Sequence, residues 1–146
     1  MARRPAWFLA LALSLSAAPV AAQSLDYDFF KRRVEPIFLE QRAGHARCYA
    51  CHSQSNNGFH LERLAAGSKF WSEEQSRNNF DLIQRVVNQG DPKESPLLLH
   101  PLDPRAGGDA FHSGGRQFAS RQDKDWKILA QFVGAAPATK PQTKRQ

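Results

Sequence analysis

Cys48-Tyr49-Ala50-Cys51-His52 is the stretch of this chain that says most about its fold and chemistry. Two thiols three positions apart lie on one side of a helical turn, and a histidine follows the second thiol. Cys-x-x-Cys-His is the attachment pattern of c-type haem, in which each thiol adds to one vinyl group and the histidine binds the iron. We therefore predict one covalently attached haem c, with Cys48 and Cys51 as its thioethers and His52 as the proximal iron ligand.

Three other uses of the two cysteines fit the sequence less well. A zinc site needs a second pair of ligands about 12–15 residues further on, and only His60 lies near that position. A thioredoxin-like redox pair needs a βαβ context, which the sequence does not predict. A disulfide between Cys48 and Cys51 would close a very short loop, which constrains the unfolded chain least. Zinc is therefore the main alternative to haem.

The N-terminus predicts export. Two arginines precede a short apolar run at residues 7–15, and Val20-Ala21-Ala22 matches a small-residue cleavage site. We predict a signal peptide over residues 1–22 and a periplasmic or otherwise exported mature protein, the compartment in which bacteria attach c-type haem. The apolar run is shorter than the roughly 20 residues that a membrane span needs. No transmembrane span is therefore expected in the mature chain.

Size and charge indicate a single small domain with an unstructured end. About 124 residues remain after cleavage, and loss of the two signal-peptide arginines lowers the formal charge from +6 to +4. The basic residues are spread along the chain without interleaved aromatics, so nucleic-acid binding is not predicted. Residues 134–146 are rich in Pro, Ala, Thr, Lys and Gln and predict a disordered basic tail. The domain itself is expected over residues 23–133.

The first and last segments of this domain predict amphipathic helices. Residues 26–40 have helical spacing, with Pro36 expected to kink or restart the helix. Ser120 is expected to cap the last helix. Apolar residues form a stripe on one face of each helix: Phe30, Val34 and Phe38 on the first, and Trp126, Leu129 and Val133 on the last.

Shorter helices are expected between them, and no segment alternates like a strand. Ser72-Glu73-Glu74-Gln75 forms a capping box that opens a helix, and Gly90 is its expected end. Ser95-Pro96 predicts a cap followed by proline at the first helical position. The predicted fold class is therefore all-α.

A helical chain with terminal helices around a haem pentapeptide resembles class I cytochrome c. It is similar to the planctomycete-type cytochrome c domains, which share a Val-Glu-Pro-Ile-Phe entry (residues 34–38) and a Gly-Asp-Pro-x-x-Ser-Pro-Leu segment (residues 90–97). The resemblance implies that the first and last helices cross and pack through the two apolar stripes, and that the fold wraps around one covalently bound haem. It also implies that the sixth iron ligand comes from an extended loop just before the last helix.

Most class I cytochromes c use methionine as this sixth ligand, and the mature chain here has none, because Met1 leaves with the signal peptide. His112 lies in a glycine-rich loop before the last helix, where glycines allow the backbone to approach the porphyrin. We predict His112 as the distal ligand and His100 as the fallback, with an open sixth site as a further possibility. Many planctomycete-type domains carry Met-Pro near this position, so the substitution suggests bis-histidine ligation.

These residues predict an electron carrier rather than an enzyme. A low-spin iron held by two histidines has no free site, and its potential is expected below that of a His/Met cytochrome. Its partners would be redox proteins, or a larger respiratory or photosynthetic complex. The alternative is a peroxidase-like enzyme or gas sensor with an open distal site. There His112 would stand off the iron, with Arg105 or Arg116 as helpers.

Overall fold

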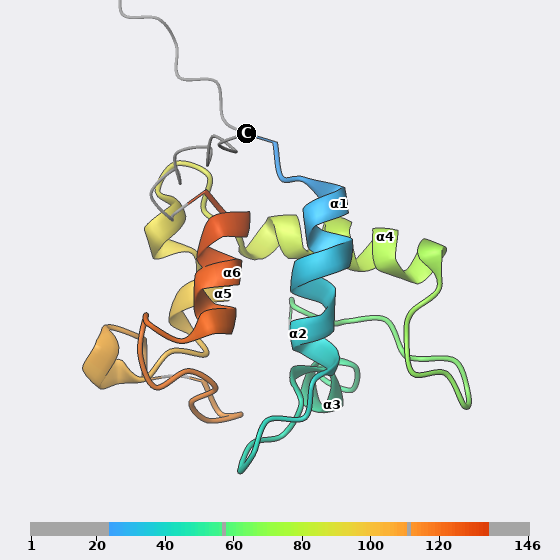
Figure 1. The fold of residues 1–146 in the computed structure, drawn as a ribbon, viewed down its shortest axis with the longest axis horizontal. Helices are drawn as coiled ribbons and strands as arrows, with labels where there is room; N and C mark the ends of the chain where they lie inside the picture. The colour runs from blue at the N-terminus through green and yellow to red at the C-terminus, as the bar shows by residue number, and fades with distance from the viewer. Residues whose placement is uncertain (1–23, 57, 111, 135–146) are drawn as a thin grey trace, which may run out of the picture.

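The computed structural model describes residues 24–56, 58–110 and 112–134, which form helices joined by loops (Figure 1). Within these ranges the only extended pairing is one parallel bridge between Leu102 and Phe118. The predicted all-α class is confirmed for this part of the chain. The expected signal peptide (1–22) and residues 135–146 of the expected tail lie outside the described residues.

The N-terminal helix is continuous but changes its winding. It consists of α1 (Tyr27–Phe29), a π-helical turn η1 (Phe30–Val34) and α2 (Glu35–Leu39). The Glu35 N–H donates to the carbonyl of Phe30, five residues back, as in a π-helix. The wider turn ends immediately before Pro36, which has no N–H to donate. The expected interruption at Pro36 is thus a local π-turn, and the helix does not break.

Helix α4 (Glu73–Ile83) begins as expected and ends earlier than expected. The Ser72 hydroxyl accepts from the Gln75 N–H at 3.2 Å, and the Gln75 side chain accepts from the Ser72 N–H at 3.1 Å. A 3₁₀ turn, η2 (Gln84–Val86), follows, and Val87 is already extended and buried. The prediction that Gly90 ends this helix is wrong, because burial of Val87 turns the chain out of the helix first.

Two serines were predicted to cap helices: Ser95 does hold the N-cap position of α5, although its side chain makes no capping hydrogen bond, whereas Ser120 is not the cap of the last helix. Helix α5 (Pro96–Leu99) begins after Ser95 with proline at its first position, but the Ser95 hydroxyl accepts from the Asn88 N–H at 3.0 Å. Ser95 therefore joins α5 to the segment after α4. Ser120 lies before the last helix, and its hydroxyl accepts from the Gln122 N–H at 3.1 Å.

The last helix, α6 (Lys124–Phe132), is capped by Asp123, so the assignment of Ser120 as its cap is wrong. The Asp123 carboxylate accepts from the N–H groups of Asp125 and Trp126, at 2.9 and 3.4 Å. A carboxylate at this position also interacts favourably with the helix dipole. Arg42 pairs with both Asp123 and the buried Asp125, which ties the loop after α2 to the start of α6.

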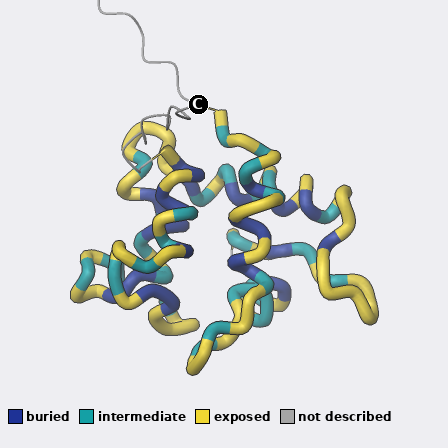
Figure 2. The backbone as a smooth tube through the Cα atoms, in the orientation of Figure 1, coloured by how far each residue is buried: buried dark blue, intermediate teal, exposed yellow. Residues whose placement is uncertain are grey.

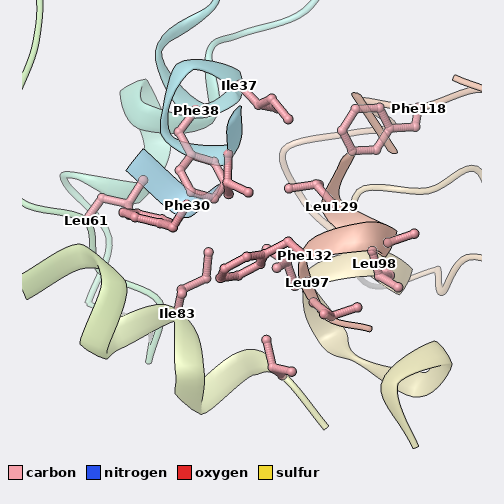
Figure 3. Packing of buried hydrophobic residues seen from close by; sticks show 14 of the residues in the cluster. Phe30, Ile37, Phe38, Leu61, Ile83, Leu97, Leu98, Phe118, Leu129 and Phe132 are labelled. Carbon is pink, nitrogen blue, oxygen red and sulfur yellow. The ribbon is translucent and has the colours of Figure 1, made fainter. Parts of the chain in front are cut away.

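The N-terminal helix and α6 pack against each other, as predicted (Figure 1). Figure 3 shows Phe132 of α6 reaching toward Phe30 and Ile83, and the Phe30 and Phe132 ring centroids lie 6.0 Å apart. Phe132 was not among the predicted contacts, and Trp126 instead donates to the Leu98 carbonyl of α5 at 3.2 Å. Figure 2 shows that buried and more exposed residues alternate along both helices. The core includes Phe30, Val34, Ile37, Phe38, Leu61, Ile83, Leu98, Leu129, Phe132 and Val133.

Candidate functional site

A cavity of about 650 Å³ lies between the pentapeptide and the segment that contains His112. Figure 3 shows its two apolar walls, with Ile37 and Phe38 from α2 on one side and Leu129 of α6 and Phe118 on the other. This volume falls within the range of about 300–1,000 Å³ that is usual for cofactor and ligand pockets. We call it the central cavity. Its chemically active lining residues are Cys48, Cys51, His52, His100 and His112.

Helix α3 (Cys48–His52) brings the pentapeptide to this cavity as one short turn. Cys48 is partly buried and Cys51 is exposed, and both thiols are free. Burial raises the pKa of the Cys48 thiol to about 11, so it stays protonated at neutral pH. The two predicted attachment residues therefore lie on the wall of one cavity, at different depths.

The ring of His52 is held in one tautomer. Its Nδ1 lies 2.9 Å from the carbonyl oxygen of Phe59, and because a carbonyl can only accept, Nδ1 carries the proton. Nε2 then has a free lone pair, which is the arrangement a histidine needs to bind a metal. Burial lowers the pKa of His52, and the imidazoles of His112 and His100 lower it further. His52 is therefore neutral at neutral pH, as a metal ligand must be.

His112 is oriented in the same way by its own turn. Its Nδ1 donates to the Gly115 carbonyl at 2.6 Å, while the Gly115 N–H donates to the His112 carbonyl at 3.0 Å. Gly115 has a φ of +79°, which favours glycine. A Cβ at Gly114 would lie 3.3 Å from Cε1 of His112, so this glycine leaves room for the ring. The glycine-rich segment thus leaves Nε2 of His112 free as well.

The two rings lie close together within the cavity wall. The centroids of His52 and His112 are 6.1 Å apart, and their planes are inclined by 16°. A metal ion held between two imidazole nitrogens, each at about 2 Å, separates the ring centroids by about 6 Å. The centroid spacing of these two rings is therefore compatible with a metal ion bound by both histidines.

The other histidines are placed differently. His100 also lines the central cavity, but its Nδ1 contacts the carboxylate of Asp109 and its side chain is 51% exposed. His60 contacts the Ser55 carbonyl through its Nδ1. His45 lies beside a separate, polar hollow near the start of α6. His112, rather than the fallback His100, is the histidine whose ring lies parallel to that of His52.

Both arginines of the peroxidase-like alternative are paired elsewhere. The guanidinium groups of Arg105 and Arg116 lie 3.0 and 3.1 Å from the buried carboxylate of Asp103. The arginines that line the central cavity are Arg47 and Arg85 instead. The structure therefore does not place Arg105 or Arg116 beside His112 in a shared cavity wall.

Within residues 24–56, 58–110 and 112–134, no group of three or more His, Cys, Asp or Glu side chains is arranged to hold a metal ion. A haem iron needs only two ligands from the protein, because the porphyrin supplies the other four.

Over the same part of the chain, no helix has the length and apolar character required to cross a membrane.

Several residues at this site were not predicted from the sequence. The carbonyls of Phe59 and Gly115 orient the two histidines. Gln117 is buried on the cavity wall, and its Oε1 has no hydrogen-bond partner. The glycines around His112 were the signal in the sequence that pointed to the Gly115 position.

The chain matches no family model, no curated protein and no solved structure. What can be said about its function therefore depends on the residues and geometry of the central cavity.

Proposed function

We propose that this protein is an exported monohaem c-type cytochrome that transfers electrons, with a class I cytochrome c-like fold around one covalently attached haem. The observation that carries the proposal is the near-parallel pair of imidazoles, His52 and His112, 6.1 Å apart beside the two free thiols of Cys48 and Cys51. The apolar cavity of about 650 Å³ that these residues share supports it.

The residues present fit the group. Cys48 and Cys51 would hold haem c through thioethers, and His52 and His112 would bind its iron. When bound, the haem supplies one-electron redox chemistry. The chain supplies the rest: Phe59 and Gly115 keep each Nε2 unprotonated, and the walls formed by α2 and α6 exclude water.

Two histidine ligands set the kind of electron transfer. If His52 and His112 both bind the iron, no iron position would remain for a substrate, and the haem would supply electron transfer alone. Without a methionine ligand, the potential lies below that of His/Met cytochromes. The physiological partners would then be redox proteins, or subunits of a respiratory or photosynthetic complex.

Packing of the N-terminal helix against α6 supports the class I-like arrangement, in which terminal helices lie together above the cofactor. The His112 segment precedes α6, where a distal ligand would be expected in that arrangement. The order of the elements and their packing therefore support the proposal in addition to the central cavity.

The test is a visible spectrum of the exported protein, reduced with dithionite, with and without carbon monoxide. We expect covalently bound haem and a sharp low-spin α band that carbon monoxide shifts only slowly. Potentiometric titration should give a midpoint below the His/Met range. Rapid, complete carbon monoxide binding would favour the gas sensor or peroxidase-like alternative, and zinc without haem would overturn the proposal.

A further inference from the structure

The loop from Pro101 to Phe118, which we call the distal loop, contains His112 and is closed at its base by backbone hydrogen bonds. The Pro101 carbonyl accepts from the N–H groups of Gln117 and Phe118, at 2.8 and 3.0 Å. The Asp103 N–H donates to the Phe118 carbonyl at 2.9 Å. These bonds fix the base of the distal loop, and His112 lies within this loop at the cavity wall.

A buried carboxylate at this base holds two exposed arginines. The Asp103 side chain is 5% exposed, whereas those of Arg105 and Arg116 are 84% and 58% exposed. Hydrogen bonds from Arg105, together with the charges of both arginines, hold the pKa of Asp103 well below its usual range. Asp103 is therefore ionised throughout the neutral pH range, and both ion pairs persist there.

The two arginines differ in what lies next to them in the chain. Arg105 lies in the short turn η4 (Pro104–Ala106), and Asp103 is the N-cap of this turn. The backbone N–H of Arg105 also donates to the Asp103 carboxylate at 2.8 Å. Arg116 comes from the other end of the distal loop and directly follows Gly115. The carbonyl of Gly115 accepts the hydrogen bond from Nδ1 of His112.

We propose that Asp103 and Arg116 are positioning residues that fix the ring of His112 through the carbonyl of Gly115. The inference rests on the proposed function, because it concerns His112 as an iron ligand. Asp103 anchors Arg116, the peptide between Gly115 and Arg116 is thereby held, and its carbonyl sets the tautomer and direction of the imidazole. Removing such outer partners of a metal ligand typically costs about 10- to 100-fold in metal affinity or activity.

The test compares two variants that remove similar charges from the same carboxylate, Arg116→Gln and Arg105→Gln. The readout is the rate at which carbon monoxide replaces the sixth ligand in the reduced, haem-loaded protein. We expect a rate roughly tenfold faster in Arg116→Gln and little change in Arg105→Gln. Asp103→Asn should reproduce the Arg116→Gln effect, and Arg116→Lys should restore part of the wild-type rate.

Equal rates in wild type, Arg116→Gln and Arg105→Gln would overturn the inference. Thermal unfolding of each variant separates ring positioning from general stability. If Arg116→Gln unfolds at a lower temperature but keeps the wild-type rate, the role is structural and the inference is wrong. The wild-type spectrum is recorded first, so an open sixth site would show that the proposed ligand set itself fails, and the inference with it.

Discussion

The imidazole rings of His52 and His112 lie with their centroids 6.1 Å apart and their planes inclined by 16°. One ring comes from the turn α3, and the other from the distal loop that precedes α6. Each donates its Nδ1 hydrogen to a backbone carbonyl, of Phe59 and of Gly115 respectively. Both rings are thus oriented by main-chain atoms that lie outside the pair.

Replacing His112 should open the sixth iron position. If the proposed ligand set holds, His112→Ala should weaken the sharp low-spin α band and let carbon monoxide bind at once, because only His52 would then bind the iron. His100→Ala is the matched control, since His100 lines the same cavity but contacts Asp109. If His100→Ala opened the site and His112→Ala did not, the fallback ligand would be the correct one.

The glycine at position 108 should be required for the shape of the distal loop. A Cβ at Gly108 would collide with the backbone carbonyl oxygen of Leu102, which cannot move without disturbing the base of the loop. We expect Gly108→Ala to lower the unfolding temperature and to speed carbon monoxide binding. Gly90→Ala is the control, because its Cβ would meet only the Asn88 side chain at an ordinary 3.5 Å. The prediction would be contradicted if Gly108→Ala and Gly90→Ala had the same unfolding temperature and the same rate of carbon monoxide binding.

Phe132 should contribute more to stability than any exposed aromatic side chain. It is 6% exposed, and its ring lies near those of Phe29, Phe30 and Phe80. Phe132→Ala should lower the free energy of unfolding by about 3–5 kcal/mol, as usual for buried aromatic residues. Phe70 is 69% exposed, so Phe70→Ala should change it by less than about 0.5 kcal/mol. Chemical denaturation measures the free energy of unfolding of both variants. Similar losses of this free energy in Phe132→Ala and Phe70→Ala would contradict the assignment of Phe132 to the core.

The cap of α6 can be tested with two single substitutions. Asp123 accepts from two N–H groups of the first turn and also pairs with Arg42, so Asp123→Ala should cost about 1–2 kcal/mol. Ser120→Ala should cost less than about 0.5 kcal/mol, since Ser120 bonds only within the preceding turn. Denaturant unfolding followed by circular dichroism measures both losses and decides whether Asp123 or Ser120 caps α6. A larger loss in Ser120→Ala would restore the cap predicted from the sequence.

The stabilisation by Asp103 should depend on pH in one direction. Its pKa is lower in the folded state than in the unfolded state. Its contribution is therefore present above the ordinary carboxyl pKa of about 4 and shrinks as the pH falls below that value. Asp103→Asn should unfold at a lower temperature than wild type at pH 7. This difference in unfolding temperature should become smaller in acid. The exposed Asp28, paired with Arg32 on the helix surface, supplies a control, Asp28→Asn. A difference in unfolding temperature between Asp103→Asn and wild type that stays constant with pH would contradict the prediction.

Features that depend on neighbouring residues could be predicted from the sequence. Cys48, Cys51 and His52 lie on one turn because their spacing is local, and the capping box of Ser72 and Gln75 forms for the same reason. The cap of α6 was misplaced because Ser120 and Asp123 are both good capping residues, and local chemistry does not choose between them. The choice depends on Arg42, which reaches Asp123 from a distant loop.

The sequence by itself determined the helical class, the pentapeptide turn and the choice of His112 as the first candidate for a distal ligand. Only the tertiary structure decided which histidine lies parallel to His52, which carbonyls hold the two rings, and that Asp103 joins Arg105 to Arg116. Helical and capping patterns depend on residues a few positions apart, so they can be recognised in the chain. The pairing of His52 with His112 depends on how the distal loop closes and how α6 packs on the N-terminal helix, and no local pattern encodes that geometry.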